Sequence, residues 1–321
     1  MSSKVNVTVS QDGRGNFRTI TEAVKNAPFN SSERYVIYIK AGFYMEEMVV
    51  VKQSNIMFLG DGMGKTVMRT TRSSVDGQNI QQSANLDSVI QGSDFIAQDM
   101  SFQNTAAIEK YQAVALKNDG DKSVFYRCSF EGHQDTLYVN QGRQFYRECE
   151  ISGTIDFIFG DASAVFQKCT IKVRTPIKGE ANVITAQGRE NVNLNTAISI
   201  QDCLIINGEP CPGMPCLDPQ VVKTYLGRPW MKYSRTMIMQ SFIDFLVDPA
   251  GWLPHEGKEK TCTYREFQNR GPGADTSRRV RWLDYKAIDD PREAMTYTVN
   301  SLIQGDEWIP ATGVPYVSGL I

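Results

Sequence analysis

Two aspartates fall at matching places in consecutive segments of the chain and could together do nucleophilic or acid–base chemistry. Asp135 lies seven residues after Cys128, and Asp156 lies seven residues after Cys149. If the cysteines mark equivalent points on successive turns of a repeating structure, the carboxylates lie on neighbouring strands, ~4.8 Å apart. Two carboxylates that close cannot both ionise easily, so one pKa is expected to rise while the other stays low. The alternative is a pair of stacked aspartates that only cap turns.

Arg228 and Trp230, within the segment Leu226–Trp230, could complete such a site. A guanidinium can hold a carboxylate ionised through paired N–H donors, and an indole offers a flat face to a sugar ring. An ordinary turn with a buried tryptophan would use the same residues. The whole chain has two histidines, His133 and His255. This excludes a multi-histidine metal site and leaves few ways to build a Ser-His-Asp triad, so hydrolysis is expected to use carboxylates.

A repeated strand-like segment must position these residues. Its copies align at a cysteine, or at the Met or Ser that replaces it, and successive anchors are 28, 21, 20 and 34 residues apart, then nearly 40. The copies are Phe95–Phe102, Val124–Phe130, Gln144–Ile151, Val165–Ile171, Ile198–Ile205 and Thr236–Ile243. The short intervals match one turn of a solenoid, and the long intervals match turns that carry inserted loops.

The composition of the copies indicates which solenoid this is. They are short, rich in β-branched and aromatic residues, and alternate apolar with polar positions, whereas helical periodicity is almost absent from the middle of the chain. Gly, Asn and Asp supply turns in the gaps. The sequence therefore predicts an all-β fold, a parallel β-helix, with a β-sandwich of chance-similar strands as the alternative.

Both ends of the chain predict helices that cap the solenoid. A helical pattern within residues 17–27 ends at Pro28, and near the other end Asp290 can cap a helix with Pro291 in its first turn. The residues expected on the inward faces are Ile20, Ala23, Val24 and Ala27 in the first helix and Ala294, Met295 and Thr298 in the second. No linker divides the chain, so residues 1–321 are expected to form a single domain.

Composition excludes several classes of protein. The net charge of −2 does not suit a nucleic-acid binder, and no apolar run approaches the ~18 residues of a membrane span. No signal peptide is expected after Met1, although the sequons at Asn6 and Asn30 would accept glycans in a secreted protein. The segment 60–66, GDGMGKT, lacks the first glycine of a phosphate-binding loop and is interpreted as a turn.

Longer blocks of the sequence resemble the signature sequences of plant-type pectin methylesterases, in family order and spacing, from about Val7 to Leu320. The blocks are QAVAL (112–116), HQDTLYV (133–139), TIDFIFG (154–160), ITAQGR (184–189), YLGRPW (225–230), GPGADTSRRVRW (271–282) and QGDEWIPATGVP (304–315). The resemblance implies a right-handed parallel β-helix that removes methyl groups from methyl-esterified galacturonan in pectin. The products would be methanol, a proton and a free carboxylate, and no metal or organic cofactor is implied.

The resemblance also implies the catalytic roles. Asp156 would be the nucleophile that forms an acyl-enzyme anhydride, and Asp135 would protonate the departing methanol and then activate water. Gln112 and Gln134 match the glutamines that donate to the developing oxyanion.

Four further residues match positions around the substrate. Arg228 matches the arginine that orients the nucleophile, and Trp230 matches the tryptophan that packs on the sugar. Phe159 and Trp252 are expected to line the cleft.

The chain departs from the family pattern at three places. His133 stands where the family usually has an aromatic residue, so it would either titrate near pH 6.5 or fill the slot with its ring. Residues 78–88 lack the family's threonine-containing block, and Gln82 is the candidate for that place. After Trp252 the usual second tryptophan is missing from residues 253–261, LPHEGKEKT, and the loop looks shortened.

The seven cysteines leave several pairings open. Stacked cysteines on neighbouring turns would permit disulfides, and the resemblance suggests Cys169–Cys203 or Cys149–Cys169. Cys211 and Cys216 could close a small loop. Alternatively all seven are reduced, and the stacked ones act as small core hydrophobes.

The resemblance predicts a secreted glycoprotein monomer of the plant cell wall that acts on pectin, with a proteinaceous pectin methylesterase inhibitor as a possible partner. Neither nucleic acid nor membrane is an expected partner. Two other functions use the same fold: cleavage of the polysaccharide itself by a hydrolase or lyase, and a non-catalytic β-helix that only binds. Glutamines beside Asp135 favour an oxyanion, and therefore an ester substrate.

Overall fold

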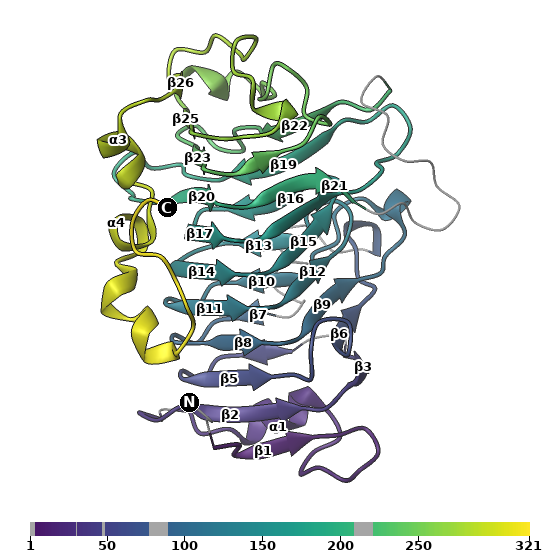
Figure 1. Cartoon of the computed structure of the whole chain (residues 1–321). Coiled ribbons are helices and arrows are strands. Elements are labelled where there is room, and N and C mark those ends of the chain that lie inside the picture. The colour runs from purple at the N-terminus through teal and green to yellow at the C-terminus, as the bar shows by residue number, and fades with distance from the viewer. Residues whose placement is uncertain (1–3, 30, 47–48, 77–88, 209–220) are drawn as a thin grey trace.

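The chain winds into a long coil whose walls are three parallel sheets of short strands (Figure 1). This computed structural model describes residues 4–29, 31–46, 49–76, 89–208 and 221–321. Every named strand pair is parallel, and along the central coils consecutive strands fall in the three sheets in turn. Because crossovers between parallel strands are right-handed almost without exception, the fold is a right-handed parallel β-helix, as predicted.

Sheet A has eleven strands in the described chain: β1 Val7–Val9, β2 Tyr35–Ile39, β5 Ile56–Leu59, β8 Ile96–Gln98, β11 Ser123–Tyr126, β14 Arg143–Arg147, β17 Ser163–Gln167, β20 Ala197–Gln201, β23 Arg235–Met239, β25 Thr263–Phe267 and β26 Tyr285–Ala287. Sheet B comprises β3 Gly42–Met45, β6 Thr66–Thr70, β9 Ser101–Asn104, β12 Ser129–Glu131, β15 Glu150–Gly153, β18 Thr170–Val173, β21 Leu204–Asn207 and β24 Phe242–Ile243. Sheet C comprises β4 Val50–Val51, β7 Val89–Ile90, β10 Leu116–Asn118, β13 Leu137–Val139, β16 Ile155–Gly160, β19 Asn182–Gln187 and β22 Thr224–Gly227.

The predicted cysteine anchors mark the bend between sheets A and B. One residue before each anchor adopts positive φ, the left-handed conformation that reverses the chain within a single residue. These residues are Asp99, Arg127, Glu148, Lys168, Asp202 and Gln240. The anchor then points inward, and the next residue starts the sheet B register, in which Ser129 pairs with Glu150 and Glu150 with Thr170. The repeat assignment is therefore confirmed.

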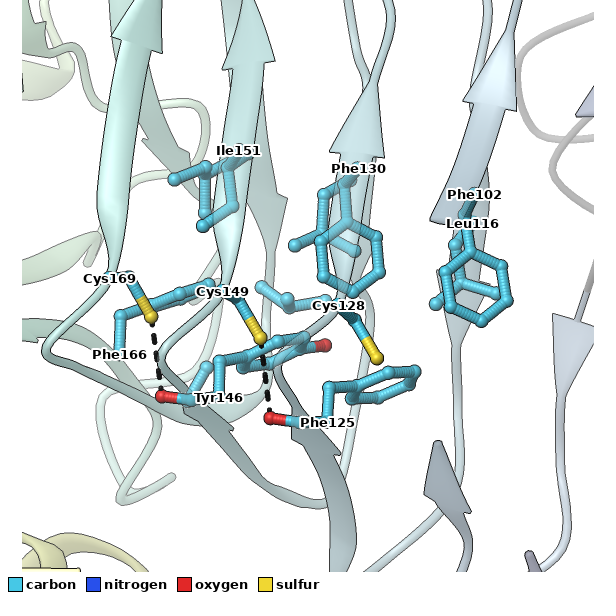
Figure 2. Close-up of a cluster of buried hydrophobic side chains, with 14 of the residues drawn as sticks. Phe102, Leu116, Phe125, Cys128, Phe130, Tyr146, Cys149, Ile151, Phe166 and Cys169 are labelled. Carbon is cyan, nitrogen blue, oxygen red and sulfur yellow. Dashed lines mark hydrogen bonds between the residues drawn. The ribbon is translucent and has the colours of Figure 1, made fainter. Parts of the chain in front are cut away.

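Aromatic rings stacked along the coil axis fill the core (Figure 2). Phe125, Tyr146 and Phe166 follow one another on consecutive strands of sheet A, with ring centroids 4.9 and 4.5 Å apart. Phe102 and Phe130 stack at 5.4 Å beside them. All five side chains are buried, and burial of a phenylalanine contributes about 1.5–3 kcal/mol.

The five described cysteines are free thiols, four of them stacked in the core. Cys149 Sγ donates to the Phe125 carbonyl at 3.3 Å, and Cys169 Sγ donates to the Tyr146 carbonyl at 3.4 Å (Figure 2). Among the described residues the structure thus corresponds to the reduced alternative. The candidate pair Cys211 and Cys216 lies outside the described residues.

Helix α1 (Ile20–Asn26) covers the N-terminal coil, as predicted. Thr19 caps it, and Glu22 returns a bond to the Thr19 N–H, which completes a capping box. Ile20, Ala23 and Val24 are buried, so the inward face of this helix is the one expected.

The sequence predicted that the C-terminal helix would cap the other end of the solenoid. The structure instead places the C-terminal helices along the side of the coil. Helices α3 (Pro291–Met295) and α4 (Val299–Ile303) run beside sheet A, and α4 contacts β14 and β17 (Figure 1). Asp290 caps α3 as expected, but the helix ends at Met295, whose side chain is 48% exposed. Because the chain turns there, Thr298 is buried as the N-cap residue of α4.

This C-terminal segment, residues 288–321, covers an apolar stripe on the outer face of sheet A. Its buried residues, such as Leu302 and Trp308, form one cluster with a residue from each of nine strands, from Val36 in β2 to Phe267 in β25. Beyond them, Gln167 Nε2 donates to Val317 O and Gln201 Nε2 donates to Gly319 O, each at 2.9 Å.

Single-turn 3₁₀ helices occupy several of the connections. They are η1 Ser74–Asp76, η2 Ile108–Lys110, η3 Lys258–Lys260, η4 Pro272–Ala274, η5 Gly305–Glu307 and η6 Ile309–Thr312. Across the described ranges, every helix is too short or too polar to cross a membrane.

Candidate active site

Sheet C brings the two predicted aspartates onto neighbouring coils. Asp135 lies just before β13 and Asp156 lies within β16, and these strands pair with Leu137 opposite Ile158. The Asp135 N–H donates to the Ile155 carbonyl at 3.0 Å. Both aspartates adopt positive φ, 62° and 50°, a conformation that aspartate tolerates better than most residues. The register predicted from the cysteine spacing is confirmed.

Arg228 binds Asp156 through two guanidinium nitrogens. Its Nε donates to Asp156 Oδ1 at 2.9 Å, and a terminal nitrogen donates to Oδ2 at 2.6 Å. Arg228 follows β22, two strands along sheet C from β16, and its N–H donates to the Thr185 carbonyl of the strand between them at 2.9 Å. Such a two-point contact fixes both the charge and the orientation of the carboxylate.

Electrostatics distinguish the two carboxyls. Burial and then the Asp156 charge raise the pKa of Asp135 well above its ordinary range, against the opposing effect of Arg228. Burial also raises the pKa of Asp156, but the hydrogen bonds and charge of Arg228 oppose that shift. The expectation that one pKa stays low was therefore wrong. The order of ionisation still follows, because the arginine bonds only Asp156 and leaves Asp135 as the carboxyl that keeps its proton to higher pH.

The two predicted glutamines lie side by side on successive coils. Gln112 and Gln134 form a parallel bridge, and the Ala113 N–H donates to the Gln134 carbonyl at 3.1 Å. Ser74 Oγ donates to Gln112 Oε1 at 2.8 Å. This bond uses the accepting end of the amide and leaves Nε2 as the donor.

Aromatic rings line the outer face of sheet C next to the aspartates. Phe159 stacks on Tyr138 with ring centroids 4.3 Å apart, and the Phe159 and Trp230 rings meet edge to face with centroids 5.7 Å apart. Trp230 is partly exposed, whereas Phe159 is 3% exposed. A Cβ on Gly188 would lie 2.8 Å from the Trp230 ring, so only glycine lets the indole lie this close to the backbone. Trp230 presents accessible surface, whereas Phe159, which was expected to line the cleft, is buried beside it.

Comparisons with known proteins show the family of the chain. The family model described as pectinesterase matches residues 6–306. The chain belongs to the pectinesterase family.

Curated members of the family cover nearly all of this chain. It is 47% identical to "Pectinesterase 2" of Citrus sinensis over 319 residues, which is 99% of this chain and 61% of the relative. It is 50% identical to "Pectinesterase 3" of Solanum lycopersicum over 321 residues, which is 98% of this chain and 57% of the relative. The chain thus spans less than two thirds of the length of these relatives.

Solved structures of the family share the fold. The structure named "Pectin methylesterase from Carrot" is 45% identical, with a TM-score of 0.93 over 100% of this chain and 99% of that one. A pectin methylesterase from Aspergillus niger is 28% identical, with a TM-score of 0.78 over 97% of this chain and 96% of that one.

Trp252 does not line the cleft that was expected from the pectinesterase resemblance. Its side chain is fully buried, and its Nε1 donates to Glu266 Oε1 at 3.1 Å. Arg279 holds the same carboxylate at 2.8 Å, and the Tyr264 ring packs on the indole with centroids 4.4 Å apart. Trp252 is therefore a core residue that supports Gly227, with which it forms a parallel bridge.

His133 does not titrate near pH 6.5. Burial and then the charge of Arg174 lower its pKa to about 4, so the ring is neutral at physiological pH and occupies space as an aromatic residue would. Gln82 and the departure at residues 78–88 fall outside the described residues.

Sequence reasoning missed His255, whose pKa responds to the charges of Arg228 and Asp156. The signal for it was the register of residues 252–255. Trp252 pairs with Gly227, the residue before Arg228, so His255 follows on the neighbouring coil. The inserted loop between the two coils hid that register, because its length does not fix which residues pair.

Proposed function

We propose that this chain hydrolyses the methyl esters of galacturonan in pectin, and releases methanol. The observation that carries the proposal is the Asp156 carboxylate held at two points by Arg228, beside the buried Asp135 on the neighbouring coil. The relatives named pectinesterase and the carrot pectin methylesterase structure support it.

In the first step Asp156 attacks the carbonyl carbon of the ester. A lone pair of its carboxylate forms the new C–O bond, and the carbonyl π electrons move to the oxygen. When the tetrahedral intermediate collapses, the bond to the methoxy oxygen breaks and that oxygen takes the Asp135 proton, so methanol leaves and a mixed anhydride remains. Arg228 keeps the attacking carboxylate ionised and correctly turned.

The negative charge that develops on the carbonyl oxygen needs donors that are already in place. Gln112 and Gln134 supply side-chain amides from adjacent coils, and Ser74 orients the first of them. Removal of one such donor typically costs about 10²–10³-fold in rate.

In the second step Asp135, now ionised, takes a proton from water. The resulting hydroxide attacks the substrate carbonyl of the anhydride, and Asp156 leaves as a carboxylate. The product acid loses its proton to solvent. Asp135 keeps the proton that it took from water, so it is again protonated for the next cycle. Trp230 supports the sugar through its exposed face.

The test is a proton NMR time course on highly methylated pectin. The expected result is a growing methanol singlet without new unsaturated or reducing-end signals, which would indicate chain cleavage instead. Asp156→Ala should abolish methanol release while its thermal unfolding stays near that of the parent. Asp289→Asn, at an exposed carboxylate, is the control that should keep full activity. A folded Asp156→Ala protein that still releases methanol would overturn the assignment of the nucleophile.

We further propose that the protein acts as a secreted monomer in the cell wall, where its polymeric substrate lies, and that a proteinaceous pectin methylesterase inhibitor binds it. Relatives whose names combine "pectinesterase" with "pectinesterase inhibitor" support the second point. Light scattering with and without such an inhibitor would test both the monomer and the complex.

A further inference from the structure

His255 lies on the coil next to the one that carries Arg228. Gly227 and Trp252 form a parallel bridge, and the Leu253 N–H donates to the Gly227 carbonyl at 2.9 Å. His255 lies three residues after Trp252, just as Trp230 lies three residues after Gly227. The segment that holds the imidazole therefore runs beside the segment that holds the arginine and the exposed indole.

The charges around His255 are already paired with one another. Within the described part of the chain, those that act on its ring belong to Arg228, Glu256, Lys258 and Asp156. Arg228 bonds Asp156, and Lys258 Nζ bonds Glu256 Oε2 at 2.7 Å. The Glu256 carboxylate lies at 4.0 Å from His255 Nε2, at the limit of an ion pair. A proton on His255 would thus add one positive charge to two cations and two carboxylates that are already paired with each other.

This ring is also reachable from solvent. The His255 side chain is 25% exposed, whereas His133, the other histidine, has a buried Nδ1 that lacks a hydrogen-bond partner. A partly exposed cation on a segment beside Arg228 is suited to bind an anion.

We propose that His255, in its protonated form, binds an ionised uronate carboxylate on a sugar unit near the ester that reacts at Asp156. The proposal rests on the proposed function, because that reaction converts neutral methyl esters into carboxylates along the same polymer. His255 is then a specificity-determining residue that favours partly de-esterified chains at acidic pH and loses this preference when the imidazole becomes neutral.

The direction of the pH effect follows from the surroundings of the ring. Burial and then the charge of Arg228 lower the pKa of His255 below its usual 6.5, so the free protein binds this proton only at acidic pH. A bound carboxylate favours the charged ring and raises that pKa. By linkage, the carboxylate must then bind more tightly as the pH falls through this range.

Trigalacturonate tests the proposal, since it is fully de-esterified and cannot react. With two histidines in the chain, the ring protons of His255 can be followed by proton NMR and assigned with His255→Gln. Saturating trigalacturonate should raise the pKa of His255. The dissociation constant should fall about fivefold between pH 7.5 and pH 5, the scale of one partly exposed ion pair.

Matched variants separate this effect from other titrations, including that of Asp135. His255→Gln should remove the fivefold pH dependence, whereas His255→Lys should bind tightly at both pH values. Lys260→Gln, which removes an exposed charge from the same loop, should behave as the parent does.

An unchanged His255 pKa in the presence of bound trigalacturonate, or an unaltered pH dependence in His255→Gln, would overturn the inference. Methanol release from methylated pectin is measured on the same preparations. If methanol is released but bound trigalacturonate leaves the pKa of His255 unchanged, this inference alone is refuted. If no methanol is released, the proposed function is refuted.

Discussion

At the scale of single residues, burial and the charge of Arg228 have opposite effects on the ionisation of the two aspartates. Burial disfavours the charge on both Asp135 and Asp156, but only Asp156 receives the guanidinium of Arg228. In the proposed mechanism, one arginine thus makes Asp156 the nucleophile and leaves Asp135 as the acid. The cost is that a carboxyl is kept in a place where its charged form is unfavourable.

That cost predicts a pH-dependent gain of stability in Asp135→Asn. The folded state raises the pKa of Asp135 above its ordinary 3.8, so this group destabilises the fold as pH rises from about 4 through the raised pKa. The neutral amide should therefore increase the free energy of unfolding by about 1–2 kcal/mol at pH 8 and change it little at pH 4. Urea unfolding at the two pH values measures this.

The same variant should lose about 10²–10⁴-fold in methanol release, because an amide can neither donate the proton to methanol nor accept one from water. A variant as active as the parent would remove Asp135 from the mechanism, and equal stabilisation at both pH values would show that ionisation is not the cause.

At the scale of elements, the parts that could be predicted from the sequence are those that repeat. The two coils anchored at Cys128 and Cys149 follow the same path from the cysteine to sheet C, so a spacing of seven residues placed Asp135 and Asp156 in register. Met295 was assigned wrongly because the predicted inward face assumed a helix that continues to Thr298, whereas α3 has five residues and ends at Met295. Trp252 was assigned wrongly because the direction of its side chain depends on Glu266, on a later strand.

The position of Trp252 predicts that Trp252→Phe affects stability rather than substrate binding. The variant loses the hydrogen bond to Glu266 and part of the packing on Tyr264, at an expected cost of about 1–3 kcal/mol. Thermal unfolding should show the loss, while KM for pectin stays within twofold. Trp230→Phe, at the partly exposed indole, should show the reverse pattern, and a raised KM in Trp252→Phe would restore the original cleft assignment.

At the scale of the whole molecule, the C-terminal segment 288–321 connects coils that are distant in sequence. Its buried side chains belong to one cluster with residues of sheet A from Val36 to Phe267, and its final backbone groups bond Gln167, Gln201 and Gln240. The sequence predicted helices here but not their place, since an apolar helical face fits the side of a solenoid as well as its end.

Leu302→Ala tests this role of the segment. Leu302 is 1% exposed on α4, so its truncation should cost about 2–5 kcal/mol in urea unfolding. Met295→Ala, at an exposed position of the same segment, should stay within about 0.5 kcal/mol of the parent. If residues 1–321 form one domain, both variants should unfold in a single transition. A loss confined to a separate early transition would show that the segment is an independent appendage.

Solenoids in general are nearly one-dimensional, because each coil touches only the coils before and after it. Such a stack can fray from either end, with each coil released after its neighbour has gone. Here the segment 288–321 gives coils at opposite ends of the row a shared partner, so the loss of one coil weakens the attachment of the others. Fraying should therefore be replaced by all-or-none opening, and a protease would find few partly open molecules to cut.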